Sequence, residues 1–318
     1  MISAMAPNYT ILLLSRLFTA LTHGSFLGVS AVIAANIVRP EKRARAVAMV
    51  MAGLTISNIV GVPIGTLIGQ QWGWRATFYT VVMMGVISFI GIWILIPKLR
   101  QEPAAPLASQ FRSLIQPRML LMFLVGALGC GSLFSVFTYI APLLQDVSGF
   151  KEVSVTWILV LFGIGITIGN LAGGKLADWK LVPSLKVIYL GTAVVLGVFA
   201  YTVFNPVMAL VTVFLWGLLA FAMMPGVQLR SIYFARNAPS LASTMNHSAA
   251  NLGNAGGAFL GGWVITNLGI VHLPWLGAIL SFLALVVIWI SSRLEQKEQA
   301  GTADISAFAL NHKEAVNK

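Results

Sequence analysis

The chain has 318 residues, of which 58% are hydrophobic and only 9% are charged. Soluble domains carry roughly 25% charged residues, so this composition excludes a soluble globular protein and a disordered one. The net charge of +11 could suit nucleic-acid binding, but the basic residues are dispersed between apolar runs. The single cysteine, Cys130, and four scattered histidines give no disulfide framework and no metal-ligand spacing, so no cofactor is expected.

The uncharged stretches are long enough to cross a bilayer, which takes about 20 apolar residues each. All nine acidic residues lie outside them. Extending the first stretch back to about Asn8 takes in Arg16, the one basic residue within the apolar runs. Two stretches hold two spans each, because Asn205-Pro206 and residues 267–274 interrupt them. We therefore predict an all-α polytopic membrane protein with nine transmembrane helices, covering approximately 8–37, 46–70, 75–97, 118–144, 153–175, 184–204, 207–229, 241–267 and 271–292.

Basic residues gather in alternate loops, such as 39–45 and 175–186, and the loops between hold at most one. Since basic loops stay on the cytoplasmic side, this pattern predicts a multi-pass inner (plasma) membrane protein. The N-terminus of this chain is expected to be periplasmic and the C-terminus cytoplasmic. Residues 98–117, rich in Pro, Ala and charge, are expected to form a cytoplasmic linker. Residues 294–318 are expected to form a disordered, polar cytoplasmic tail.

The sequence repeats itself weakly at one offset. Residues 57–69 resemble residues 250–262, with Asn58 matching Asn251 and Gly69 matching Gly262. The first two expected spans thus correspond to the seventh and eighth, which indicates a unit of six spans. Parallel six-span repeats are a transporter architecture, so an intact design has twelve spans. This chain is expected to lack the first three.

Five stretches resemble motifs of one family of transporters. They are Leu14–Gly24, Gly53 with Gly61–Gly65, Trp74–Phe78, Phe137–Leu144 with Gly149-Phe150, and Gly174–Asp178. In that order, they look like a fourth-helix arginine motif, a fifth-helix antiporter motif, the entry to a sixth helix, a seventh helix with its exit, and the loop motif of a second half. On these stretches, the sequence resembles the major facilitator superfamily, and within it the drug:proton antiporter group with the arabinose-efflux-permease-like proteins.

The resemblance implies helices 4–12 of a twelve-helix fold. Residues 1–97 would be the last three helices of the first bundle, and residues 118–293 the second six-helix bundle. The implied function is proton-coupled efflux of a small organic solute, such as a sugar, a nucleoside-like compound or a drug. The alternative is a transport-incompetent fragment, or a piece that needs a partner to supply helices 1–3. An enzyme is not expected, because the spans hold no carboxylate pair and no Ser/His/Asp set.

Arg16 is the main candidate for the substrate or proton pathway. A charge within a membrane costs at least about 2.5–3.5 kcal/mol, so it usually faces a cavity or a partner. The alternative is an arginine that extends toward the outer interface or braces helices. His23 lies seven residues later on the same helix face, where it could relay protons or simply pack.

Polar residues in other spans could also contact a solute, or could only link helices. For the pathway we select Asn58, Tyr139, Gln228 and Asn251 in addition to Arg16 and His23. For packing and gating we select the small residues and proline of the fifth-helix motif, and two residues of the loop motif. These are Gly53, Gly61, Pro63, Gly65, Gly174 and Asp178.

Overall fold

The fold is given by a computed structural model of the chain. It describes residues 1–39, 46, 49–50, 52–53, 56–96, 114–235 and 238–316. Within these, the side chains of 297–316 and of some other helical positions, including His23, Asn58 and Pro63, are not described. Most of the expected linker, 98–113, lies outside the described residues.

The described chain is helical, and no strand occurs in it. Most helix bounds fall within a few residues of the expected spans. The elements are α1 (Tyr9–Ile37), η2 (Ser57–Gly61), α3 (Val62–Trp72), α4 (Trp74–Leu95), α6 (Pro117–Phe137), α7 (Ile140–Pro142), η3 (Leu143–Val147), α8 (Glu152–Thr202), α9 (Pro206–Phe234), α10 (Pro239–Leu268), η4 (Ile270–His272) and α11 (Leu273–Val316).

Two of the predicted breaks have clear local causes. Pro206 lies in the first turn of α9, and the Asn205 side chain caps that helix by accepting hydrogen bonds from the amides of Val207 and Met208. Asparagine at this position satisfies amides that have no partner inside the helix. α10 ends at Leu268, and the next residue, Gly269, has a φ of 95°, which suits glycine and separates α10 from η4.

The expected fifth and sixth spans form one long element, α8, which bends at Lys180. The backbone of Lys180 is not helical (φ −149°, ψ 89°). Across the bend, the Ser184 hydroxyl donates to the Leu176 carbonyl at 2.8 Å. The bend lies between the two expected spans, 153–175 and 184–204, and it separates α8 into two limbs.

The helix of the expected span 118–144 is interrupted near its end. α6 ends at Phe137, and a turn at Thr138 and Tyr139 separates it from α7 and the π-helical turn η3. Pro142 has no amide hydrogen, so it cannot donate to the carbonyl four residues earlier, that of Thr138. The helix is interrupted where that hydrogen bond would be.

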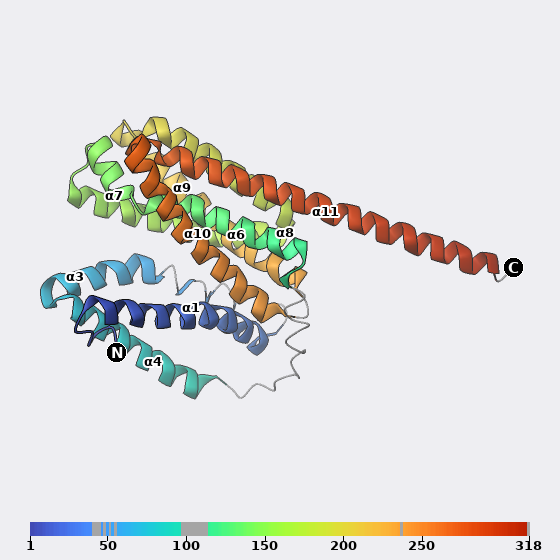
Figure 1. Cartoon of the computed structure of the whole chain (residues 1–318), viewed down its shortest axis with the longest axis horizontal. Coiled ribbons are helices and arrows are strands. Elements are labelled where there is room, and N and C mark those ends of the chain that lie inside the picture. Colours follow the sequence, from blue (N-terminus) through green and yellow to red (C-terminus); the bar gives the residue numbers. More distant parts are fainter. Residues whose placement is uncertain are drawn as a thin grey trace.

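The helices form two groups that lie side by side (Figure 1). In one group α3 packs against α4, with α1 beside them; in the other, α8 packs against α9 and α11, while α6 packs against α10 and α11. Contact between the groups comes from α1 against α10 and from η2 against α8. The interface between the groups is therefore formed by α1 and η2 on one side and by α10 and α8 on the other.

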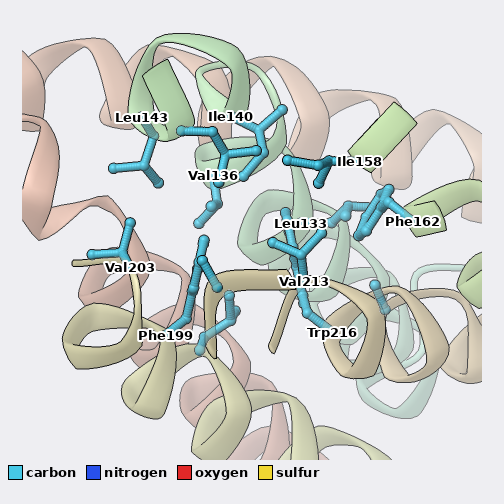
Figure 2. Close-up of a cluster of buried hydrophobic side chains, with 14 of the residues drawn as sticks. Leu133, Val136, Ile140, Leu143, Ile158, Phe162, Phe199, Val203, Val213 and Trp216 are labelled. Carbon is cyan, nitrogen blue, oxygen red and sulfur yellow. The ribbon is translucent and has the colours of Figure 1, made fainter. Parts of the chain in front are cut away.

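The main apolar core lies among α6, α8 and α9 (Figure 2). Trp216 of α9 is fully buried, and its ring centre lies 4.7 Å from that of Phe162 and 6.4 Å from that of Phe199. Burial of aromatic side chains on this scale dominates packing energy. The core holds the two limbs of α8 against α9 and α6.

Glycines bring two pairs of helices into backbone contact. Gly165, Gly169 and Gly173 of α8 recur every four residues and face the backbone of α9. Gly253, Gly257 and Gly261 of α10 face the backbone of α6 in the same way. Small residues at this spacing let membrane helices approach closely and gain dispersion contacts.

By length and apolar composition, the described residues contain five helices able to span a bilayer. They are α4, α6, α8, α9 and the segment from Ile270 to Gln296. The membrane character of the fold is thereby confirmed, and the count of nine stays a prediction. α11 continues to Val316, so the backbone of the expected disordered tail is helical instead.

Candidate functional site

Arg16 projects from α1 toward the start of α4. Its guanidinium carbon lies 4.9 Å from the ring centre of Phe78, which is a cation–π contact. The residue is exposed in this structure. A charged residue within a span is expected to have a partner. For Arg16, part of that partner is the aromatic ring of Phe78 on α4.

A second arginine, Arg75 at the start of α4, holds the residues that precede α1. The Arg75 guanidinium donates to the Ala6 carbonyl at 3.0 Å and lies 4.2 Å from the ring centre of Trp74. α4 begins at Trp74, as the sixth-helix motif predicts. His23 lies farther along α1, but its side chain is outside the described residues, as is that of Asn58 in η2.

The fifth-helix motif forms an irregular helix start. Ser57–Gly61 makes a π-helical turn, and Pro63 stands in the first turn of α3. Such turns arise where the regular hydrogen-bond ladder is interrupted, and proline interrupts it. Gly65 packs on α4, because the Thr77 hydroxyl donates to its carbonyl at 3.1 Å. A side chain at Gly53 would have open space around it.

The face of α10 carries two amides close to each other. Asn251 is exposed, and the Asn254 amide nitrogen lies 3.5 Å from its side-chain oxygen. The side-chain oxygen of Asn254 is buried and accepts no hydrogen bond from the described residues. α10 is also the helix that contacts α1, so these amides lie on a helix of the interface between the two groups.

Tyr139 links the turn after α6 to α10. Its hydroxyl donates to the Ala258 carbonyl of α10 at 2.9 Å. Its ring lies over Gly261 and Gly262, where an added Cβ would come within 2.8 Å of tyrosine atoms. The structure therefore favours the packing interpretation of Tyr139, with the turn after α6 held against α10.

Gln228 is also occupied by its neighbours. Its amide nitrogen donates to the Ser243 hydroxyl, and its oxygen accepts from the Asn246 amide at 2.8 Å. All three side chains are buried between α9 and α10. Of the two interpretations of Gln228, the interhelical contact fits this geometry.

The loop motif lies at the bend of α8. Asp178 is exposed, two residues before Lys180. An added Cβ at Gly174 would meet nothing within 4 Å, whereas one at the neighbouring Gly173 would overlap the backbone of Ala222. The close helix approach is therefore made by Gly173, and Gly174 is not a packing residue in this structure.

Comparison with known proteins decides the family. The sequence profile of the Major Facilitator Superfamily matches residues 1–246. The chain belongs to the Major Facilitator Superfamily. The inner membrane transport protein YdhP of Escherichia coli K12 is 40% identical to this facilitator over 293 residues, which cover 92% of this chain and 75% of YdhP.

Two more distant relatives carry the resemblance to the drug and arabinose efflux group. The chloramphenicol resistance protein of Streptomyces lividans is 33% identical, over 90% of this chain and 74% of the relative. The putative transporter AraJ of E. coli K12 is 29% identical, over 94% and 76%. Both support the resemblance seen in the motifs, and the predicted class, a membrane transporter, is confirmed.

A solved structure confirms the fold. The fucose:proton symporter FucP of E. coli superposes with a TM-score of 0.69, covering 91% of this facilitator and 78% of FucP. Sequence identity is 12%, so this likeness concerns the fold alone.

Sequence reasoning missed two features of this facilitator. One is the α8 glycine series, which its four-residue spacing could have revealed. The other is Arg230, which counts as a loop residue by sequence but is only 2% exposed, and which forms an ion pair with Glu295 of α11 at 3.1 Å. Its pairing could not be read from a sequence, because 65 residues separate the two partners.

Proposed function

We propose that this facilitator exports a small organic solute, such as a sugar, a nucleoside-like compound or a drug, in exchange for protons. Family membership and the relative named for chloramphenicol resistance support export. FucP, which shares the fold, is a proton symporter by name, which supports coupling to protons but not the direction of exchange. The solute would pass between the two helix groups, along the interface formed by α1 and α10.

The observation that carries the proposal is Arg16. It is the one basic residue within an apolar run, and a charge there costs at least about 2.5–3.5 kcal/mol. The contact with Phe78 offsets only part of this, since a cation–π pair contributes about 0.5–2 kcal/mol. A group retained at such a cost is expected to act on a proton or on a polar part of the solute.

The solute contacts would come from the amides of α10. Asn254 offers a buried acceptor that a hydroxyl or N–H group of the solute would satisfy, and Asn251 is exposed beside it. A buried polar group without a partner costs about 1–3 kcal/mol, so a donor bound there is favoured. Tyr139 and Gln228 would keep α10 in place rather than contact the solute.

Alternating access would come from rocking of the two groups. The π-helical turn and Pro63 give the start of α3 the freedom to bend. Asp178, at the bend of α8, would act as a gate on the cytoplasmic side. In the orientation that the basic loops predict, the helices cross the inner membrane with the C-terminus in the cytoplasm and the N-terminus of this chain in the periplasm.

Reconstituted vesicles test the proposal. The purified chain is placed in liposomes with a proton gradient, and labelled chloramphenicol and a labelled pentose serve as probes. A pH-sensitive dye records whether solute movement is accompanied by proton movement. Solute movement that the gradient drives supports the proposal.

The outcome that contradicts the proposal is equally specific. Solute flux unchanged when the proton gradient is collapsed would exclude coupling. Absence of any flux from a folded, inserted chain would favour the alternative, in which a partner supplies further helices. Circular dichroism of the reconstituted chain establishes that it is folded.

A further inference from the structure

Arg16 carries a charge for which the described residues supply no counter-charge. The residue is exposed, and its guanidinium carbon lies 4.9 Å from the ring centre of Phe78. Among the described residues, no carboxylate pairs with Arg16 and no acceptor for its N–H groups occurs. The face of a ring attracts a cation, but a phenylalanine side chain is not among the hydrogen-bond acceptors of proteins. The N–H groups of Arg16 are therefore open to an acceptor from another molecule.

The amino-acid sequence also provides no carboxylate near Arg16 within its own helix group. All nine acidic residues lie outside the apolar runs, and residues 1–97 hold only one of them, Glu41. Glu41 follows the far end of α1, and from Arg16 to Ile37 this helix rises about 32 Å. The four residues after Ile37 span at most about 14 Å, so Glu41 cannot reach Arg16. The helix group that carries Arg16 therefore does not neutralise it.

The chemistry of arginine separates the two roles considered for Arg16. An arginine side chain keeps its proton in proteins, so it acts as a fixed positive charge and does not itself carry a proton across the membrane. Its planar guanidinium matches the two oxygens of a carboxylate, to which it donates paired hydrogen bonds. Attraction between opposite charges is stronger where little water surrounds them. A carboxylate therefore provides both the counter-charge and the acceptors that Arg16 lacks.

We propose that Arg16 and Phe78 form a binding site for the carboxylate group of an organic acid, so that acidic solutes are preferred over neutral ones of the same shape. Arg16 donates to the carboxylate oxygens, and the ring of Phe78 beside the guanidinium contacts the apolar part of the same molecule. A cationic solute is repelled by the same arginine. This inference rests on the proposed transport function, and among its solutes it favours acidic members, such as a sugar acid.

Three ligands of nearly equal shape test the preference without any transport. Benzoate is anionic, benzamide is neutral and benzamidine is cationic. The full chain in a neutral detergent at low salt is titrated with each, and the dissociation constants are measured by calorimetry. We expect benzoate to bind at least about tenfold more tightly than benzamide, because hydrogen bonds between charged groups are the stronger ones. Benzamidine should bind most weakly. High salt should reduce these differences, because it screens exposed charges.

Matched variants assign the preference to Arg16. Arg16→Gln removes the charge and should bind benzoate no more tightly than benzamide. Arg16→Lys keeps the charge without the paired donors and should retain part of the preference. Arg75→Gln removes another arginine in contact with an aromatic ring and should leave the order of affinities unchanged. Circular dichroism establishes that each variant is folded. Equal binding of the three ligands, or an unchanged order in Arg16→Gln, would overturn the proposal.

A competition experiment separates a solute from a lipid as the source of the oxyanion. Phosphatidylglycerol is added to the benzoate titration, and undiminished benzoate binding supports the solute site. Displacement of benzoate by this lipid would assign Arg16 to a headgroup phosphate and overturn the proposal. Failure of the transport function gives a different result. In that case proton-driven flux is absent from vesicles, whereas benzoate still binds in preference to benzamide and the preference still depends on Arg16.

Discussion

Gly173 of α8 contacts the backbone of Ala222 in α9 so closely that a methyl group on Gly173 would overlap the Ala222 carbonyl. The neighbouring residue, Gly174, has open space at the same position. The two adjacent glycines therefore differ in packing: only at Gly173 does the close approach of the helices require a residue without a side chain. This makes them a matched pair for testing how the α8–α9 contact stabilises the fold.

We predict that Gly173→Ala lowers the free energy of unfolding by about 1–3 kcal/mol, because α8 and α9 must move apart. Gly174→Ala should be neutral, or stabilising by up to about 1 kcal/mol, since alanine favours the helix. Thermal unfolding of both variants in the same detergent measures the difference. Equal effects of the two substitutions would mean that the helices do not approach as described.

The corresponding pair on α10 tests the contact with α6. An added Cβ at Gly257 would overlap the backbone of Gly131, while one at Gly256 would meet nothing within 4 Å. We expect Gly257→Ala to reduce solute flux severalfold at equal protein content, because α10 would shift with its amides. Gly256→Ala should retain flux. A Gly256→Ala variant as impaired as Gly257→Ala would argue against packing as the cause.

The Arg230–Glu295 pair predicts an asymmetry between single and double substitutions. Glu295→Gln leaves the guanidinium of Arg230 buried with no carboxylate partner among the described residues. We expect a loss of about 1–3 kcal/mol, less than for a fully buried pair, because Glu295 is 31% exposed. Replacing both residues, with Arg230→Met, removes the buried charge too and should recover part of that loss. A double variant less stable than Glu295→Gln alone would contradict this account.

Local sequence signals located most helix ends. Asn205-Pro206 and Gly269 act through their own backbone and side chains, so their effect is visible in the sequence. Pro142 is a comparable local signal for the break after α6, but the residues around it are apolar throughout, so the apolar pattern alone does not mark the break. Contacts between residues on different helices are harder to predict from sequence. Whether Tyr139 faces a solute or Ala258 depends on how α6 and α10 pack, which no local pattern encodes.

Tyr139→Phe tests the packing role of Tyr139. The variant keeps the ring over Gly261 and Gly262 and loses only the hydrogen bond to Ala258. We expect the free energy of unfolding to fall by about 0.5–1.5 kcal/mol. The KM for a transported solute should stay within about twofold, which corresponds to less than about 0.5 kcal/mol. A KM raised tenfold with unchanged stability would return Tyr139 to the solute pathway.

Substitution of Arg16 tests the transport proposal most directly, with solute flux as the measured quantity. Arg16→Ala should reduce solute flux at least tenfold without loss of membrane insertion, since one charged residue less makes the span more apolar. Phe78→Leu should reduce flux less, because it removes the aromatic contact and leaves the charge in place. Arg75→Gln is the control: it removes another arginine in contact with an aromatic ring, and it should retain flux. Flux and membrane content are measured on the same vesicles. If Arg16→Ala transports as well as Arg75→Gln, Arg16 only braces α1 against α4 and the polar pathway must be sought on α10 alone.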